Sequence, residues 1–231
     1  MQRLLIIPAR GNSKRIPMKN IKLFHKKPII NYVLSLAKKS NLFNKIHVST
    51  ESKKIASVVN NFGLEIDFLR PKKLSQDNVS TISVLKYVYK KYLNLGFNFN
   101  EVWTIPPCSP LLLKKDLINV SKISKDNKNK VVLAITKYGA PIYWAFEKNK
   151  KKLLKPLFKS KIFSRSQNFK NTYYDAGAIA VYPHNFLTKK INNIENKFIG
   201  YELPAERAVD IDDMDNWKFA EYLFKAKKNN N

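Results

Sequence analysis

The sequence predicts an α/β fold with a doubly wound, mostly parallel sheet. Short apolar runs alternate with helical periodicity through the first two-thirds of the 231-residue chain, which is typical of strands joined by covering helices. The first apolar run, residues 4–7, leads directly into a turn of small and basic residues. Ligands of such sheets bind beyond the carboxyl ends of strands. From Gly139 to about Gly200 the alternation is lost, and we expect an inserted arm that supplies substrate contacts.

The individual elements follow from the periodicity of apolar residues. Strands are predicted for residues 4–7, 45–50, 64–69, 102–105, 131–136 and 176–182. Helices are predicted for residues 28–39, 51–62, 81–95, 114–124 and 213–225. The first of these helices begins with a proline, which suits a first turn because the N–H it lacks would have no partner there. We therefore expect one domain, 1–231, with 139–200 as an excursion.

Composition excludes several classes of protein. The chain is 44% hydrophobic and has 12% aromatic residues, so it can bury an ordinary core. No stretch approaches the ~18–20 apolar residues that span a membrane, and no signal-peptide pattern precedes the first strand. The one cysteine, Cys108, excludes an internal disulfide, and the three histidines lack metal-ligand spacing. We expect a soluble, cytoplasmic protein.

The charge is strongly positive, with 43 Lys and Arg against 17 Asp and Glu and a net charge of +26. Such a surface attracts polyanions, so a nucleic-acid-binding protein is the alternative from another functional class. However, the lysines are spread along the whole chain and do not form one patch with interleaved aromatic residues. We therefore expect a solvated basic surface with no specific nucleic-acid partner. The charge also suits an enzyme whose substrates are anions.

The turn after the first strand reads Pro-Ala-Arg-Gly-Asn-Ser-Lys-Arg-Ile-Pro-Met-Lys-Asn-Ile over residues 8–21. Backbone N–H groups in a tight turn, together with basic side chains, form an anion site. The Gly-Lys-Ser/Thr ending of a P-loop is absent, and the single glycine excludes the Rossmann fingerprint. Local chemistry thus favours a triphosphate-binding loop, with a solvated basic loop as the alternative.

This motif resembles the nucleotide-binding loop of the acylneuraminate cytidylyltransferases, the CMP-sialic acid synthetase family. That family has branches for pseudaminic and legionaminic acids and a more distant branch for the sugar acid Kdo. The resemblance implies a nucleotide-diphospho-sugar transferase-like fold, and CTP as a substrate. It implies nucleotide binding by loop residues Ala9, Arg10, Asn12, Ser13, Lys14, Arg15, Lys19 and Asn20.

The second motif is Val-Asp-Ile-Asp-Asp at residues 209–213. If this segment is extended, Asp210 and Asp212 point the same way with Ile211 behind them, as two carboxylates that could hold Mg²⁺. Alternatively, the aspartates cap and complement the helix that follows. The resembled family has an Asp-x-Asp metal pair here, which implies a Mg²⁺ site at Asp210 and Asp212. Asp213 and Asp215 are then expected to be helix caps.

The third motif places Arg70 and Pro71 before a predicted helix that begins near Thr81. By itself this is a turn and a helix start, with Ser80 or Thr81 as the N-cap. In the resembled family, the corresponding arginine and small polar residue contact the cytosine ring and the ribose. The resemblance therefore implies base recognition by Arg70 and Thr81.

Two further motifs concern the second substrate. Sialic acid enzymes carry a glutamine near the sugar where this chain has Pro106, which argues against plain sialic acid. Arg165-Ser166-Gln167 and the run from Tyr173 to Ala178 resemble the pseudaminic acid branch, although a tyrosine replaces its histidine. An arginine binds a carboxylate through two parallel hydrogen bonds, so Arg165 is a candidate for the sugar carboxylate. The implied sugar-binding residues are Arg165, Gln167, Tyr174, Asp175 and Gly177.

Together the motifs imply a cytidylyltransferase that joins CTP to a nine-carbon 2-keto sugar acid. The implied acceptor is pseudaminic acid, with N-acylneuraminic and legionaminic acids as alternatives. The implied catalytic residues are Arg10, Lys14, Lys19, Asp210 and Asp212, acting with Mg²⁺ by positioning and charge stabilisation. The sequence singles out no general base. The resemblance also implies a homodimer whose arms complete each other's sugar sites.

Overall fold

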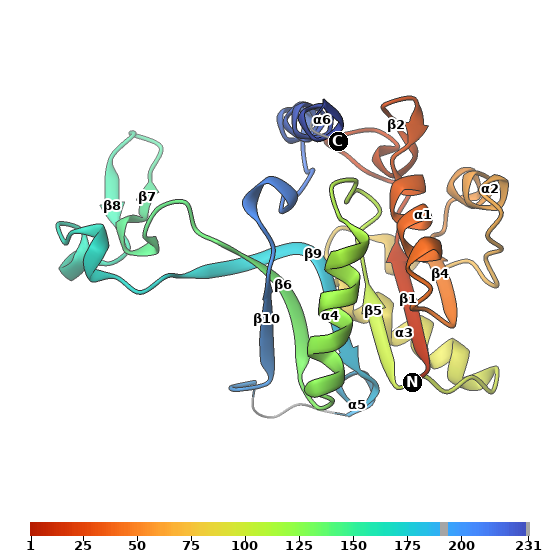
Figure 1. Cartoon of the computed structure of the whole chain (residues 1–231). Coiled ribbons are helices and arrows are strands. Elements are labelled where there is room, and N and C mark those ends of the chain that lie inside the picture. Colours follow the sequence, from red (N-terminus) through yellow and green to blue (C-terminus); the bar gives the residue numbers. More distant parts are fainter. Residues whose placement is uncertain (190–193, 230–231) are drawn as a thin grey trace.

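A six-stranded sheet forms the centre of the computed structural model, which describes residues 1–189 and 194–229 (Figure 1). Its order is β10–β6–β9–β5–β1–β4. The bounds are β1 Arg3–Pro8, β4 Lys45–Ser49, β5 Glu101–Thr104, β6 Val131–Lys137, β9 Tyr173–Pro183 and β10 Phe198–Glu202. Strand β9 runs antiparallel to both of its neighbours, and the other pairs are parallel. The predicted mostly parallel sheet is therefore confirmed.

Helices cover both faces of this sheet, as a doubly wound fold requires. Their bounds are α1 Ile30–Ser40, α2 Lys53–Asn61, α3 Thr81–Asn94, α4 Lys114–Asp126, α5 His184–Thr188 and α6 Met214–Asn229. Helices α1, α2 and α4 pack on one face, and α3 and α5 pack on the other. The five predicted helices are all present. The N-cap of α3 is Ser80, whose Oγ accepts the N–H of Ser83 at 3.3 Å.

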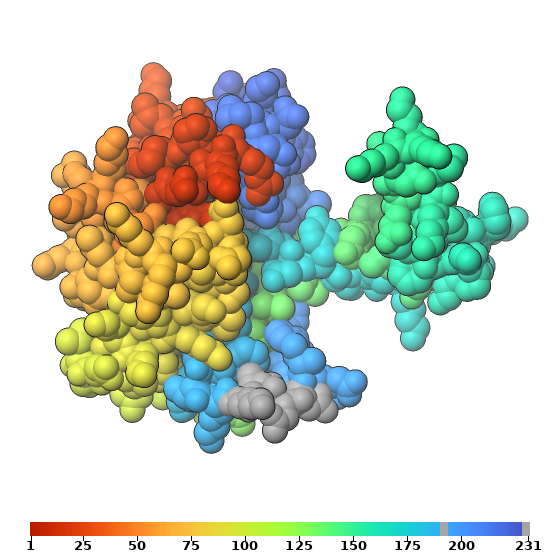
Figure 2. Space-filling model, turned by 180° about the vertical axis from the view of Figure 1, so that it is seen from behind, coloured from red at the N-terminus to blue at the C-terminus, as the bar shows by residue number. Residues whose placement is uncertain are grey.

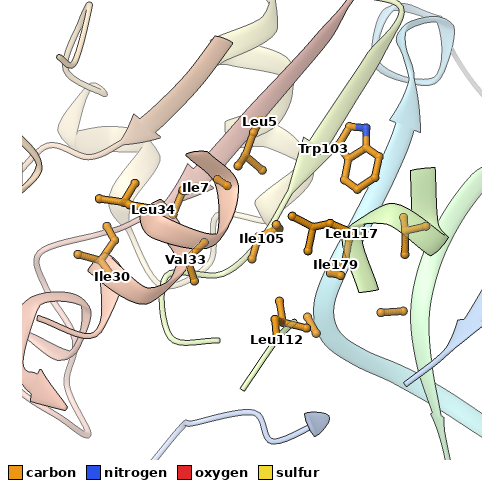
Figure 3. Close-up of a cluster of buried hydrophobic side chains, with 14 of the residues drawn as sticks. Leu5, Ile7, Ile30, Val33, Leu34, Trp103, Ile105, Leu112, Leu117 and Ile179 are labelled. Carbon is orange, nitrogen blue, oxygen red and sulfur yellow. The ribbon is translucent and has the colours of Figure 1, made fainter. Parts of the chain in front are cut away.

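The larger core cluster lies between the sheet and helices α1 and α4 (Figure 3). Leu5 and Ile7 of β1 face Val33 and Leu34 of α1, and Trp103 of β5 is fully buried. Each such side chain contributes about 1.5–3 kcal/mol when it leaves water. This packing fixes the strand ends that carry the functional loops.

One predicted strand is wrong. Residues 64–69 alternate between apolar and polar, but the segment has no regular structure and lies alongside the edge strand β4. Leu64 and Ile66 pack on the first core cluster, while Phe68 packs on the cluster beneath α3. The alternation therefore reflects packing on two clusters, without a backbone ladder.

The region predicted as an excursion, 139–200, divides into two parts. Residues 139–172 project from the body as an arm with a small hairpin of β7 Phe146–Lys148 and β8 Leu154–Pro156 (Figure 1). Figure 2 shows this arm standing apart from the body on a narrow connection. Strands β9 and β10 return to the main sheet. Residues 190–193 of the predicted excursion and 230–231 of the predicted domain lie outside the described residues.

A third apolar cluster closes the carboxyl edge of the sheet. Trp217 and Ala220 of α6 pack on Phe24 of a short ribbon formed by β2 Leu23–Phe24 and β3 Lys27–Pro28. Ile16 and Ile211 belong to the same cluster, so it anchors the segments on either side of the functional loops. Among the described residues, no helix is both long and apolar enough to cross a membrane.

Candidate active site

A pocket of about 660 Å³ opens at the carboxyl ends of β1 and β5. Pro8 and Thr104 end these two strands and both line the pocket. Further lining comes from five other segments: the loop through Asn20, residues 70–84, residues 106–111, residues 175–182 and residues 207–212. Segments that lie far apart in the sequence therefore meet where a doubly wound sheet binds ligands.

The first loop contributes most of the positive charge. The lining residues from it are Arg10, Ser13, Lys14, Arg15, Lys19 and Asn20. Asn20 is buried and its Nδ2 donates to the Arg10 carbonyl oxygen at 2.8 Å, which braces the loop across its base. The other two residues expected to bind nucleotide, Ala9 and Asn12, are not among the lining residues; Ala9 is fully buried in the core.

Two carboxylates pair with the four cations of this loop. Asp77 accepts Arg10 Nη1 at 2.7 Å and Lys14 Nζ at 2.6 Å. Asp212 accepts Arg15 Nη2 at 2.9 Å and Lys19 Nζ at 3.4 Å. Phosphate oxygens are alternative partners for the same cations. The pocket therefore holds ion pairs that an anionic ligand can replace.

Asp210 and Asp212 both line the pocket, while Ile211 between them is buried in the third cluster. This is the alternation expected of an extended segment. Burial opposes ionisation of Asp212, but Lys19 and Arg15 outweigh it and hold the pKa of this carboxyl below its usual value. Burial raises the pKa of Asp210, and the neighbouring Asp212 raises it further. Asp210 has no hydrogen-bond or ion-pair partner among the described residues.

These two carboxylates fit a divalent cation in their chemistry. Mg²⁺ prefers oxygen ligands and is bound by one or two carboxylates together with substrate phosphates. Asp210 forms no ion pair among the described residues, and burial together with Asp212 raises its pKa despite the nearby Lys19 and Arg15. Within the described ranges, no group of three or more potential metal ligands from His, Cys, Asp and Glu occurs. Further ligands would therefore come from the substrate or from water.

Asp213 caps the last helix, as predicted, whereas Asp215 lies within its first turn. Its Oδ1 accepts the N–H groups of Asp215 and Asn216 at 3.0 and 2.9 Å. Two neighbouring aspartates thus differ in their surroundings, because Asp212 faces the pocket and Asp213 faces the start of α6.

Arg70 and Thr81 line the same pocket, although they lie far from the first loop in the sequence. Arg70 is 5% exposed, and its Nη2 donates to Glu51 Oε2 at 3.1 Å.

The sequence motifs did not identify Glu51, Asp77 or Thr104. Glu51 could have been found as an acid near the carboxyl end of a predicted strand. Asp77 lies beside the identified Arg70 motif, and Thr104 lines the pocket with a buried Oγ1 that has no partner among the described residues.

The expected sugar-binding residues are divided between two places. Asp175 and Gly177 line the pocket, and Asp175 Oδ1 accepts the Gly177 N–H at 2.9 Å. Gly177 has φ +58°, a conformation that glycine adopts easily. Tyr174 lies outside the lining, with its ring 4.8 Å from that of Tyr138. Arg165 and Gln167 are exposed on the arm and do not line the pocket of their own chain.

The segment after β5 forms the floor of the pocket with Pro106, Cys108 and their neighbours. Cys108 donates to Asn20 Oδ1 at 3.4 Å. Burial raises the pKa of its thiol to about 12. A thiol with a raised pKa carries little thiolate at neutral pH, which fits Cys108 as a support for the loop through its contact with Asn20.

Comparison with known proteins identifies the family of this chain. Residues 4–176 match the family described as Cytidylyltransferase. The chain is 31% identical to the pseudaminic acid cytidylyltransferase of Campylobacter jejuni serotype O:2, over 98% of this chain and 97% of the relative. It is 26% identical to the N-acylneuraminate cytidylyltransferase of Escherichia coli O18:K1:H7, over 98% of this chain and 52% of the relative.

Solved structures show the same fold. CMP:2-keto-3-deoxy-manno-octonic acid synthetase, in a complex with CTP, matches with a TM-score of 0.74 at 15% identity, over 98% of this chain and all of the other. A cytidylyltransferase from Leptospira borgpetersenii matches with a TM-score of 0.59 over the whole of this chain and 95% of the other. The family match spans most of the sequence, and the Campylobacter jejuni relative aligns over nearly the full length of both proteins. The chain therefore belongs to the cytidylyltransferase family.

Proposed function

We propose that this protein transfers the cytidylyl group of CTP to pseudaminic acid or a closely related nine-carbon 2-keto sugar acid. The observation that carries the proposal is the pocket, which joins the cationic loop, Arg70 with Thr81, and the pair Asp210 and Asp212. The choice of sugar rests on the full-length similarity to pseudaminic acid cytidylyltransferases.

In the proposed reaction, the anomeric hydroxyl of the sugar loses its proton to water, and its oxygen bonds to the α-phosphorus of CTP. The bond from that phosphorus to the bridging oxygen breaks, and pyrophosphate leaves with the bonding electrons. Arg10 and Lys14 exchange Asp77 for phosphate oxygens, and Lys19 assists from the floor of the loop. Rate acceleration then comes from orientation and from charge stabilisation by side chains that are already in place.

We propose that Asp210 and Asp212 hold Mg²⁺ during this reaction. When bound, the ion would supply positive charge beside the α-phosphate and the departing pyrophosphate. Lys19 Nζ donates to the Ile211 carbonyl at 2.6 Å and lies 3.4 Å from Asp212, so it orients the segment that carries both carboxylates. Binding at Asp210 would also relieve the unfavourable burial of its charge.

We further propose a homodimer in which each arm completes the pocket of the other chain. Arg165 and Gln167 lie outside their own pocket. The arm also carries large apolar side chains that are exposed in the single chain, among them Leu153 at 63% and Phe163 at 99%. An exposed apolar surface of this kind marks a contact with another protein surface. With one cysteine in the chain, we propose a cytoplasmic location.

The direct test measures pyrophosphate release from CTP with Mg²⁺ and a panel of acceptors: pseudaminic, legionaminic and N-acetylneuraminic acids and Kdo. We expect release with pseudaminic acid and little with N-acetylneuraminic acid, because Pro106 offers no polar side chain to the sugar. Release with a different acid of the panel would change the assigned substrate and leave the proposed cytidylyl transfer unchanged. Folded protein that binds no CTP would overturn the proposal.

A further inference from the structure

Glu51 lies behind the pocket, between its phosphate side and its base side. It follows the carboxyl end of β4 and precedes α2, and it is not among the residues that line the pocket. Its side chain is 13% exposed. A carboxylate in this position acts through its neighbours, since the wall of the pocket separates it from a bound ligand.

Both oxygens of Glu51 accept hydrogen bonds from parts of the nucleotide site. Oε1 accepts the backbone N–H of Gly11 at 2.7 Å, in the middle of the cationic loop. Oε2 accepts Ser75 Oγ at 2.7 Å and Arg70 Nη2 at 3.1 Å. Burial opposes ionisation, but these donors hold the pKa of Glu51 below its usual value, so the group is anionic at neutral pH.

The loop has little freedom at this contact. A Cβ on Gly11 would lie 2.9 Å from Ser52 Cβ and 3.2 Å from Glu51 Oε1, so the backbone approaches too closely for any other residue. Within the described residues, Arg70 Nε is buried without a partner. The bond from Nη2 to Glu51 is therefore the main polar contact that orients this guanidinium.

We propose that Glu51 is a positioning residue that fixes the cationic loop and Arg70 relative to each other, so that one CTP molecule can contact both at once. The inference rests on the proposed function and deepens it, because it identifies what couples base recognition to phosphate binding. Removal of the charge would leave three donors facing an amide, and both the loop and Arg70 would lose their fixed positions.

The chain supplies a matched control in Glu101. This residue is also buried and also accepts three donors: Arg3 Nε at 2.8 Å, Trp103 Nε1 at 3.0 Å and Ser124 Oγ at 2.7 Å. It lies at the amino end of β5, at the opposite edge of the sheet from the pocket. Replacement of Glu101 therefore tests the loss of a buried carboxylate without a change in the nucleotide site.

The experiment compares Glu51→Gln, Glu51→Asp and Glu101→Gln with the wild-type protein. Calorimetric titration measures binding of CTP, of cytidine and of inorganic triphosphate, and thermal unfolding checks that each variant is folded. We expect Glu51→Gln to bind CTP about tenfold more weakly or worse, with losses for both fragments. Glu51→Asp keeps the negative charge and shortens the side chain by one methylene, so we expect a smaller loss of CTP affinity. Glu101→Gln should lower the unfolding temperature and leave CTP binding unchanged.

The outcomes separate this inference from the proposed function. In turnover assays, the KM for CTP should rise in Glu51→Gln while the KM for the sugar stays near the wild-type value. Unchanged CTP binding in folded Glu51→Gln, or an equal loss in Glu101→Gln, would overturn the inference alone. A wild-type protein that binds no CTP would overturn the proposed function and the inference with it.

Discussion

The amino end of the central sheet and the cationic loop at its carboxyl end use the same types of charged residue in opposite ways. At the amino end, Arg3 and Glu101 form a buried pair whose side chains are 10% and 5% exposed. At the carboxyl end, Lys14 and Asp77 form a pair of 2.6 Å whose side chains are 71% and 51% exposed. The difference shows which charges belong to the fold and which are available to a ligand.

The physical reason lies in desolvation. A buried pair that loses one partner leaves a charge without water, which costs about 3–5 kcal/mol, so such pairs stay formed. Exposed pairs contribute about 0–1 kcal/mol because water competes with them. The pairs that Asp77 and Asp212 make with the cationic loop can therefore open for a nucleotide without loss of the fold.

The largest predicted effect concerns the buried polar and charged side chains around His47. Its imidazole is fully buried beside Asp67, Lys45 and Tyr92. Burial lowers the pKa of His47 to about 4; Lys45 adds to this and Asp67 opposes it. The unfolded chain therefore binds a proton near pH 6.5 that the folded chain takes up only near pH 4, so stability falls as the pH drops through this window.

We expect this one group to remove roughly 3 kcal/mol of stability between pH 7 and pH 4. The measurement is urea unfolding at several pH values for the wild-type protein and His47→Asn. The difference between the two free-energy curves isolates the histidine from the carboxylates that also titrate. Parallel curves would contradict the prediction.

The second prediction tests the ligand-accessible end. Asp212→Asn removes a charge from the proposed Mg²⁺ site, and we expect kcat to fall by about a hundredfold or more. The side chain is 41% exposed, so the unfolding temperature should change little. Asp213→Asn is the matched control one residue away, because asparagine caps a helix as well as aspartate does. Full activity of Asp212→Asn at limiting Mg²⁺ would contradict the metal assignment.

Much of the fold could be predicted because it depends on local patterns. The periodicity of Ile29 to Ala37 determines a helix, and the apolar run from Leu4 to Ile7 determines a buried strand. Residues 64–69 show the limit of such reasoning, since an alternating segment forms a strand only where a neighbouring strand supplies hydrogen bonds. Strand β10 at the edge was not predicted for the same reason, as its place depends on pairing with β6.

The candidate site was predictable where a motif carries its own chemistry. Residue type and spacing drew attention to the loop around Arg10 and the pair Asp210 and Asp212, but they left helix capping open for the aspartates, and the family resemblance decided between the two interpretations. Glu51 could be marked from the sequence only as an acid near the end of a predicted strand, because its importance comes from contacts with Gly11 and Arg70, which the fold brings together from separate segments. Long-range contacts of this kind leave no local signal in one sequence.

A third prediction concerns a charged residue of the arm, Arg165, which lies away from both ends of the sheet. Arg165→Ala should raise the KM for the sugar by about tenfold, because the variant would lose the charge-assisted contact proposed between Arg165 and the sugar carboxylate. The KM for CTP should change little. Lys159→Ala, which removes another exposed cation of the arm, serves as the control. An equal rise in both KM values would contradict a role in sugar binding.

The smallest predicted effect comes from Asp77, which neutralises Arg10 and Lys14 before the nucleotide arrives. These cations hold the pKa of Asp77 below its usual value, so it is fully charged at neutral pH and repels a triphosphate. Asp77→Asn keeps the shape of the side chain and removes this competition. We expect the KM for CTP to fall about two- to fivefold at low salt, with kcat nearly unchanged.

Salt dependence sharpens this last test. Screening weakens the attraction between phosphates and exposed cations, and it also weakens the competing pairs with Asp77. The variant has lost the competing pairs, so its KM for CTP should rise more steeply with salt than that of the wild type. A higher KM in Asp77→Asn at low salt would mean that Asp77 still holds Arg10 or Lys14 in place when CTP is bound. The pairs at the carboxyl end would then belong to the site itself, as the pair of Arg3 and Glu101 belongs to the fold.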